Sequence, residues 1–547
     1  MSTSPIPDLV AAGVAAGWQV TDAASLQANR TLEADVVIIG SGAGGGITAE
    51  LLARAGLTVL IVEEGALQSS QDFKMREAEA YPALYQESAA RKTRDKAINI
   101  LQGRTVGGST TVNWTSSFRT PPGTLAHWQS HHGLAGYTVA SMAPWFELVE
   151  RRLHVSDWPA PPNENNDLLR RGARQLGIPT AAIRRNVNGC WNLGYCGMGC
   201  PTNAKQSMLV TTIPAALRLG ARLLTHARAE RFVLRGERIA SLQVTALDAI
   251  GQAATGIELT LLAKHFVLAG GAINSPALLL RSNAPDPHKL LGRRTFLHPT
   301  VISAALFGQR VDAYAGAPQT IYSDHFLHTG PIDGPIGYKL EAPPLHPLLM
   351  ATTLGGFGDE HVQTMRQFAH VHGLLALLRD GFHEHAAGGA VSLDGHGNPV
   401  LDYPLTPFIW DGVRRALLSM AEIQFAAGAR SVYPVHEMAR HYTNWAQARQ
   451  AIDALPYQAL LARVVSAHVM GGCAMSDDAR LGVCDALGRY RGLANLSVHD
   501  GSLFPTAIGA NPQLSIYALA ARLASSLARE LTGKASPGFG ADGDAAA

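Results

Sequence analysis

The distribution of apolar positions predicts a βαβ unit close to the start of the chain. Residues 34–39 form a short, nearly continuous apolar run, which is typical of a buried parallel strand. Residues 44–55 then follow a helical pattern, and residues 58–62 form the next apolar run. Strand, helix and strand in this order predict a βαβ unit.

Further along the chain, the pattern predicts a second lobe of different character. Residues 264–268 are typical of another buried strand and are followed by a pair of glycines. Between about residues 283 and 461, short β-like runs and many Gly, Pro and His residues alternate with helical stretches such as 412–427. We interpret this region as a sheet with covering helices, and residues 515–531, rich in Ala and Leu, as a closing helix.

Length and composition favour a folded enzyme with more than one lobe. The chain has 547 residues, too many for one simple core. Hydrophobic residues make up 47% and charged residues 16%, which argues against disorder. The formal net charge of +2 gives no reason to expect nucleic acid or an anionic membrane as a partner.

Targeting patterns are not evident in the sequence. No run of about eighteen apolar residues is present, so no transmembrane segment is predicted. The N-terminus lacks the basic region and apolar core of a secretory signal, and five cysteines do not make a disulfide scaffold. We therefore expect a cytoplasmic protein, while association with a membrane surface and the oligomeric state stay open.

A glycine-rich turn joins the first predicted strand to the helix. Residues 40–45 have the sequence GSGAGG, with Gly40, Gly42 and Gly45 at the fingerprint positions of a dinucleotide-binding turn. These glycines allow the tight turn, the approach of a pyrophosphate to the backbone and helix N-terminus, and close packing of helix on strand. Glu63, at the end of the second strand, is placed to accept hydrogen bonds from ribose hydroxyls and would repel the extra phosphate of NADP. The motif alone does not separate FAD from NAD.

Three further segments carry a family resemblance. Residues 103–113, GRTVGGSTTVN, resemble the first signature of the glucose–methanol–choline (GMC) oxidoreductases, which are FAD enzymes. Residues 271–279, GAINSPALL, resemble the second signature of that family. The C-terminal sequences HVMGGC at 468–473 and DGSLFP at 500–505, continuing to 513, resemble its active-site region. The resemblance spans roughly residues 35 to 530, with the motifs in the order of the family.

The fold that this resemblance implies is α/β, or α+β over the whole chain. A Rossmann-like FAD-binding domain is expected from residues 31–120, 200–285 and 462–532. A substrate-binding domain, built on an antiparallel sheet with covering helices, is expected from residues 121–199 and 286–461. Residues 1–30 are expected to pack on the first domain as a leader segment, and residues 533–547 to form a flexible tail.

The cofactor implied is FAD, held without a covalent bond. Gly107 and Gly108 would let the backbone lie against a flat ring system. Some members of the family carry a flavin-linked His directly before the Asn of the first signature, but here that position is Val112. The complete set of predicted cofactor-binding residues is Gly40, Gly42, Ala43, Gly44, Gly45, Glu63, Glu64, Arg104, Gly107, Gly108, Ser109, Thr110, Asn113, Trp114, Ala229, Gly270, Asp500, Gly501, Pro512 and Gln513.

The resemblance also implies a catalytic pair, His468 and Asn511. His468 matches the general base of the family, and a neutral imidazole can take a proton near neutral pH. Asn511 matches the second active-site position and would hydrogen-bond the same alcohol oxygen while the carbon releases hydride to the flavin. The product would be an aldehyde or a ketone.

The substrate predicted by the resemblance is an apolar alcohol, with long-chain alcohols ahead of cyclic, aromatic or sterol-like ones. Apolar stretches at 345–354 and 374–378 could line a pocket for it, or could equally be core. The electron acceptor, oxygen or a quinone-type carrier, stays open. An FAD-containing lyase of the hydroxynitrile lyase type and a non-catalytic flavoprotein are the alternatives.

Clusters of cysteine and histidine raise the question of a metal, which we do not predict. Cys190, Cys196 and Cys200 lie in a stretch that resembles the long-chain alcohol oxidase branch of the family, and a structural loop is favoured over a metal site or a disulfide. The His pairs at 370–372 and 383–385 lack a third ligand at a convincing spacing, and solvated or loop histidines are expected there. His499, beside Asp500, is expected to be structural.

Overall fold

The computed structural model describes residues 6–536 and 538–539. Most of the predicted tail, and residues 1–5 of the predicted leader segment, therefore lie outside the described residues. The described part of the leader forms α1 (Leu9–Ala15) and β1 (Gln19–Asp22), and β1 pairs with a strand of the first sheet. This segment thus contributes an edge strand in addition to packing on the domain.

The first sheet has eight strands and contains the predicted βαβ unit. Parallel pairing joins its central strands, whereas β10 and β9 extend it in antiparallel fashion. In spatial order the strands are β1, β8 (Arg222–Thr225), β3 (Val59–Val62), β2 (Arg30–Ile39), β11 (Ala254–Leu268), β10 (Arg238–Leu247) and β9 (Ala227–Arg235), with β22 (Leu496–Val498) also on β11. The last residues of β2 and all of β3 are buried, as expected for strands covered on both faces.

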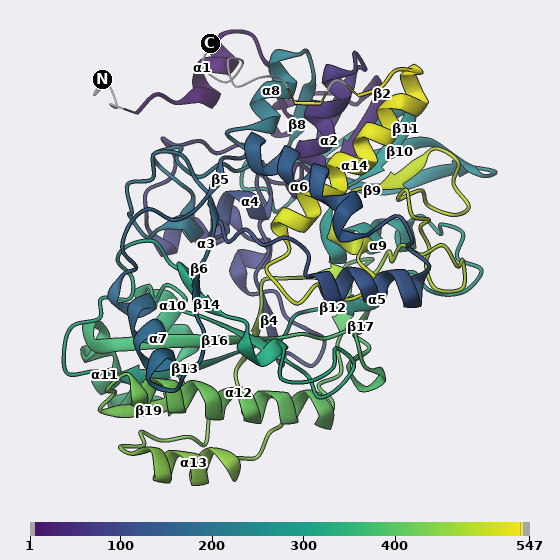
Figure 1. The fold of residues 1–547 in the computed structure, drawn as a ribbon. Helices are drawn as coiled ribbons and strands as arrows, with labels where there is room; N and C mark the ends of the chain where they lie inside the picture. Colours follow the sequence, from purple (N-terminus) through teal and green to yellow (C-terminus); the bar gives the residue numbers. More distant parts are fainter. Residues whose placement is uncertain (1–5, 537, 540–547) are drawn as a thin grey trace.

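Helices rich in small residues cover this sheet. The predicted helix of the βαβ unit is α2 (Ala43–Arg54), which packs against α8 (Thr212–Arg218) and against the closing helix α14 (Gln513–Thr532). Helix α6 (Val139–Arg152) packs on α14, as Figure 1 shows, although its residues fall within a segment predicted for the substrate-binding domain. The domain boundaries stay predictions, but α6 packs on a helix of the first domain.

The second large sheet confirms the predicted antiparallel lobe. Its spatial order is β4 (Ile98–Ile100), β20 (Val464–Ser466), β13 (Thr300–Leu306), β16 (Val371–Leu378), β15 (Tyr338–Glu341), β14 (Ile321–Ser323) and β6 (Ala181–Ala182), with β19 (Ser431–Pro434) on β13. All pairs except β4 with β20 are antiparallel. Helix α12 (Pro407–Ala426) covers this sheet, with α7 (Glu164–Gln175) and α13 (Trp445–Asp453) packed against α12 (Figure 1).

A small antiparallel sheet joins the two lobes. Its order is β18 (Pro399–Asp402), β17 (Gly389–Leu393), β12 (Arg293–Phe296) and β21 (Met470–Gly471). Because β20 belongs to the second large sheet and β21 to the small one, the chain crosses from one sheet to the other at residues 467–469. This crossing places His468 between two anchored strands.

The remaining elements are short and lie around these sheets. The helices are α3 (Glu77–Leu84), α4 (Ser109–Val112), α5 (Pro122–His132), α9 (Gly271–Arg281), α10 (Pro347–Thr353) and α11 (Gly358–Arg366), and β5 (Val155–Ser156) pairs with β7 (Arg185–Asn186). Single 3₁₀ turns occur at Ala23–Ser25, Gln86–Ala89, Cys196–Met198, His325–Leu327, Phe368–His370, Glu384–Ala386 and Gly501–Leu503. Among the helices of the described residues, none has the length and apolar content needed to cross a bilayer.

Candidate active site

One cavity of about 1050 Å³ collects nearly all of the predicted site residues. Its wall includes both predicted catalytic residues, His468 and Asn511. It also includes every predicted cofactor-binding residue except Gly45 and Gly107. The volume lies at the upper end of the range for small-molecule and cofactor pockets. The two C-terminal segments and the N-terminal glycine turn therefore face the same space.

Three glycines of the turn have two different roles. Gly42 leaves space for a ligand, whereas Gly44 and Gly45 allow other parts of the backbone to approach closely. A Cβ on Gly44 would lie 1.5 Å from the carbonyl oxygen of His499, and one on Gly45 would lie 1.9 Å from that of Gly40. A Cβ on Gly42 would meet only the Cα of Gly108, at 3.9 Å. Gly42 is also the N-cap of α2 and provides no side-chain cap, so the first N–H groups of α2 stay open to an anion.

Glu63 ties the second strand to the glycine turn. Its Oε2 accepts hydrogen bonds from the backbone N–H of Ser41 at 3.1 Å and from the Ser41 hydroxyl at 2.5 Å, and its Oε1 accepts from the N–H of Gly65 at 2.9 Å. Burial raises the pKa of Glu63. Because a carboxylate has about four acceptor positions, these three donors leave one for a ribose hydroxyl.

The neighbouring acid, Glu64, is paired. Its Oε1 lies 2.9 Å from the guanidinium of Arg104, which also donates to the carbonyl of Gly251. All three residues line the cavity. The pair joins the end of β3 to the first signature segment and to the turn after β10, so it shapes the wall near the glycine turn.

The first signature segment is held mainly by its own hydroxyl groups. The Ser109 hydroxyl accepts from the N–H of Gly103 at 2.9 Å, and the Thr110 hydroxyl donates to the carbonyl of Gly107 at 2.6 Å. The same Thr110 oxygen accepts from the N–H of Met208 at 3.0 Å. Gly107 and Gly108 have φ of +88° and +53°, in the left-handed region that favours glycine. These bonds fix the loop, in addition to any contact with a cofactor.

Asn113 and Gln513 link the first signature to the start of α14. The Asn113 side chain donates to Gln513 Oε1 at 2.6 Å, and Gln513 donates to the carbonyl of Ser116 at 2.8 Å. Tyr517, one turn further along α14, donates to the same Gln513 oxygen at 3.0 Å. Residues 400 positions apart in the chain thus form one polar edge of the cavity.

Asp500 organises the other side of the cavity. Its Oδ2 accepts from the N–H of Gly271 at 2.8 Å and from the Ser275 hydroxyl at 2.6 Å, and its Oδ1 accepts from the N–H of Ser502 at 2.8 Å. Burial raises the pKa of Asp500. This carboxylate joins the second signature, on α9, to the C-terminal segment. Asp500 lines the cavity, and its place beside the cofactor stays a prediction.

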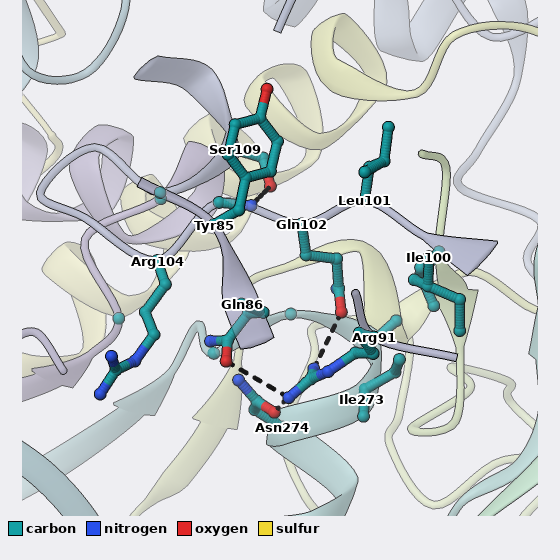
Figure 2. A pocket seen from close by; sticks show the side chains of 18 of the residues that line it. Tyr85, Gln86, Arg91, Ile100, Leu101, Gln102, Arg104, Ser109, Ile273 and Asn274 are labelled. Carbon is teal, nitrogen blue, oxygen red and sulfur yellow. Dashed lines mark hydrogen bonds between the residues drawn. The ribbon is translucent and has the colours of Figure 1, made fainter. Parts of the chain in front are cut away.

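Arg91 was not predicted from the sequence, although it braces part of the wall. Figure 2 shows its guanidinium between Gln102, Gln86 and Asn274. It donates to their side-chain oxygens at 3.0 Å, 3.3 Å and 3.4 Å, and pairs with Glu87 at 2.9 Å. The segment after α3 is thereby fastened to α9.

His468 has a second histidine as its partner. Its Nδ1 lies 3.1 Å from Nδ1 of His298, which is fully buried and has a φ of +49°. The backbone N–H of His298 donates to Asp380 Oδ1 at 3.1 Å, and Tyr403 donates to Asp380 Oδ2 at 2.7 Å. Sequence inspection did not single out His298, because a lone buried His carries no local signal.

Both imidazoles are held in the neutral form. Burial, followed by the charge of Lys339, lowers the pKa of His468 to about 3. Burial also lowers the pKa of His298 far below its usual range, and the neighbouring His468 and Lys339 act in the same direction. Between two neutral rings, one Nδ1 must donate and the other must accept. If His468 donates, its Nε2 carries a free lone pair that can accept a proton.

Asn511 contacts a buried ion pair that the sequence analysis missed. Its Oδ1 accepts from Lys339 Nζ at 2.9 Å, and its Nδ2 donates to Glu341 Oε2 at 3.3 Å. Lys339 and Glu341 lie 2.8 Å apart on β15. Side chains two positions apart on a strand share a face. Two opposite charges at this spacing in an apolar strand were therefore the sequence signal that could have predicted the ion pair.

The cysteine loop packs against the first signature without forming a disulfide. Cys190, Cys196 and Cys200 are free thiols, and residues 6–536 and 538–539 contain no group of three His, Cys, Asp or Glu side chains able to hold a metal. Buried Lys205, just after the loop, donates to the carbonyls of Thr111, Asn113 and Cys196 at 2.8 Å, 2.7 Å and 2.6 Å. The loop therefore has a bracing role in the structure.

The other singled-out residues divide between wall and core. Leu375 and Leu377 of β16 line the cavity, whereas residues 345–354 do not. His372 is buried against the carbonyl of Asn165 at 3.1 Å. His499 lies outside the cavity wall and bonds the Thr48 hydroxyl of α2 at 2.9 Å. These contacts give both histidines a structural role. The expectation of a solvated or loop residue is wrong for His372, which lies on the fully buried strand β16.

Comparison with known proteins identifies the family. The chain belongs to the GMC oxidoreductases, whose N-terminal and C-terminal family models match residues 81–300 and 386–520. An uncharacterised GMC-type oxidoreductase of Sinorhizobium fredii is 30% identical over 502 residues, covering 91% of this chain and 95% of its own length. A long-chain-alcohol oxidase of Arabidopsis thaliana is 26% identical over 512 residues, covering 89% of this chain and 66% of its own length.

A solved structure supports the same fold. Pyridoxine 4-oxidase from Mesorbium loti superposes with a TM-score of 0.65 at 20% identity, covering 90% of this chain and 98% of its own. The protein is therefore an oxidoreductase with a Rossmann-like FAD-binding fold, and FAD is its cofactor. The residues present fit that group: a glycine turn with an open helix N-terminus, a carboxylate with a free acceptor position and a large cavity beside them.

Proposed function

We propose that the protein oxidises a primary or secondary alcohol to the aldehyde or ketone, with His468 as general base and Asn511 as the residue that orients the alcohol oxygen. The observation that carries this proposal is that His468 and Asn511 line the same cavity as the dinucleotide-binding glycine turn. FAD, when bound, supplies the acceptor for the hydride that leaves the alcohol carbon.

His468 is suited to remove the hydroxyl proton. Its ring is neutral, since burial lowers its pKa to about 3, so its lone pair is free across the neutral range. With its Nδ1 donating to His298, the proton from the alcohol goes to Nε2. The resulting imidazolium stays beside the oxygen from which the proton came, and His298 holds its ring in place.

Asn511 is suited to hold the alcohol oxygen. It is 4% exposed, and one of its two amide hydrogens is used by Glu341. The second hydrogen is available as a donor to the oxygen while negative charge develops on it. Together, the two residues remove the proton and stabilise the oxygen, and the carbon is oriented by the rest of the wall.

An apolar alcohol suits the wall near the pair. Leu375, Leu377 and Thr300 line the cavity. The side-chain oxygen of Gln319, which also lines it, already accepts a hydrogen bond from the Ser116 hydroxyl at 2.9 Å. Similarity to a long-chain-alcohol oxidase supports long-chain alcohols first and cyclic or aromatic alcohols second. The electron acceptor is oxygen or a quinone-type carrier, and a cytoplasmic location belongs to the same proposal.

FAD is held by non-covalent contacts in this proposal. Val112, at the position where some family members carry the flavin-linked His, is a buried hydrocarbon side chain that cannot form such a bond. The cofactor is expected to leave the protein on acid precipitation. Flavin retained in the precipitate would contradict this part.

The test of the function is anaerobic mixing of the purified flavoprotein with long-chain, cyclic and benzylic alcohols, followed at the visible absorbance band of oxidised flavin. Bleaching by one class establishes alcohol oxidation and names the substrate class, and readmission of air then separates oxygen from other acceptors. Absence of bleaching with every alcohol, in a protein whose flavin dithionite reduces, would overturn the proposal and favour a lyase on the same fold.

A further inference from the structure

We infer that Lys339 and Glu341 are positioning residues that set the orientation of the Asn511 amide, and so decide that its N–H group faces the substrate oxygen. The inference rests on the proposed function, since it assigns a role in alcohol oxidation. It concerns a buried ion pair outside the cavity wall that neither the sequence motifs nor the predicted catalytic pair include.

The ion pair is almost completely withdrawn from solvent. The side chains of Lys339 and Glu341 are 2% and 0% exposed, and their charged atoms are 2.8 Å apart. The Lys339 ammonium also lies 3.0 Å from the centre of the Phe118 ring and 4.7 Å from that of Tyr322. Two aromatic faces and one carboxylate therefore enclose the cation.

The enclosed cation has one further polar partner, the Asn511 amide. The ammonium donates to Oδ1 at 2.9 Å, while Nδ2 donates to Glu341 at 3.3 Å. An ammonium has only donors and a carboxylate only acceptors, so each end of the ion pair accepts one end of the amide. A rotated amide would face NH₂ against NH₃⁺ and oxygen against carboxylate. The charges thus select one of two amide orientations that have nearly the same shape.

That choice matters for the reaction. In the selected orientation, the second Nδ2 hydrogen remains for the alcohol oxygen, which needs a donor as its proton leaves. In the rotated orientation, the corresponding side of the amide changes from donor to acceptor and would repel the developing negative charge. The orientation of Asn511 is thus a requirement of the chemistry that the backbone alone does not impose.

Stability alone does not account for the pair. Two charges in a dry interior lose their hydration, and replacement of such a pair by apolar side chains is often neutral or stabilising. Removal of one partner, by contrast, strands the other charge and destabilises the fold. A variant without either charge therefore separates a positioning role from a structural one.

The test compares Lys339→Met/Glu341→Leu with the parent, as FAD-loaded proteins, using the alcohol that bleaches the parent. We expect the double variant to keep its FAD content and its thermal midpoint within about 3 °C, while the flavin reduction rate falls about 100-fold with little change in KM. In an Asn511→Ala background, the same two substitutions are expected to change the rate by less than about 3-fold, because the amide they orient is gone.

Lys264→Met is the matched control. Lys264 is 77% exposed and pairs with Asp35 at 2.7 Å, and neither residue lines the cavity. Loss of this exposed ion pair is expected to leave the thermal midpoint at the parent value and the reduction rate within about 2-fold of the parent rate. Its behaviour calibrates the effect of removing an ammonium group without touching Asn511.

The outcomes separate the two proposals. Reduction of the double variant at the parent rate would overturn the positioning role, as would a full 100-fold loss in the Asn511→Ala background. If no alcohol reduces the parent, the proposed function fails, and the inference fails with it. Single Lys339→Met is expected to lower the thermal midpoint through the stranded Glu341, which the double variant repairs without restoring the rate.

Discussion

The two ends of the cavity are built in different ways. At the glycine end, residues 40–44, which are neighbours in sequence, line the cavity with their backbone, and Gly44 leaves no room for a side chain. At the catalytic end, the wall consists of side chains whose partners come from distant segments, such as His468 with His298 and Asn511 with Lys339. The first end is therefore sensitive to added atoms, and the second to the loss or rotation of a polar group.

The largest expected effect tests the backbone end. Gly44→Ala would place a Cβ 1.5 Å from the carbonyl oxygen of His499, a backbone atom that cannot rotate away. We expect the free energy of unfolding to fall by about 3 kcal/mol or more and FAD to be absent from the purified protein. Flavin absorbance and chemical unfolding measure both.

Gly330→Ala is the control for this substitution. A Cβ on Gly330 meets nothing within 4 Å, and this exposed residue does not need a left-handed backbone. Its variant is expected to match the parent in stability and FAD content. A Gly44→Ala protein with a full complement of FAD would show that helix α2 can shift. The glycine end would then not be sensitive to added atoms, contrary to the comparison made above.

The next effect tests the side-chain end. His468→Gln is expected to lower the rate of flavin reduction by roughly 10²- to 10⁴-fold, because the proton acceptor is lost. FAD content and thermal stability should stay at parent values, since the glycine end is untouched. Stopped-flow reduction under anaerobic conditions gives the rate. His385→Gln, at an exposed side chain outside the cavity wall, is the matched control and should reduce like the parent.

A smaller effect concerns the dependence of activity on pH. An imidazole in water, with a pKa near 6.5, would lose its ability to act as base below about pH 6.5. Burial lowers the pKa of His468 to about 3, so it stays unprotonated as the pH falls through 6 and 5. We expect kcat/KM to show no acidic limb near pH 6.5. A limb at that value, with FAD still bound, would mean that the base is hydrated and charged in the working enzyme.

The smallest effect concerns the cysteine loop, which lies outside the cavity wall. Cys190→Ser is expected to change the free energy of unfolding by about 0.5 kcal/mol at most, and to leave FAD content and activity unchanged. The reason is that Cys190 is a free thiol. Metal analysis and thermal unfolding of parent and variant provide the measurement. Loss of bound zinc or iron on substitution would instead reveal a ligand role.

Sequence inspection located the parts of the site that local patterns encode. The βαβ unit, the glycine turn and the closing helix follow from periodicity and glycine placement, and the structure has them as β2, α2, β3 and α14. The family resemblance supplied His468 and Asn511. What inspection missed, His298, Lys339, Glu341 and Lys205, comprises buried polar groups whose partners lie far along the chain, for example 170 residues between His298 and His468.

The sequence by itself therefore determined the local geometry of this protein: where strands and helices form, where the backbone turns tightly and which family its motifs belong to. The physical reason is that glycine conformations and periodic burial depend on near neighbours. Only the tertiary structure decided which polar groups meet. The buried pair of Lys339 and Glu341 contacts Asn511 because β15 packs beside the chain that precedes α14, and no local pattern specifies that contact.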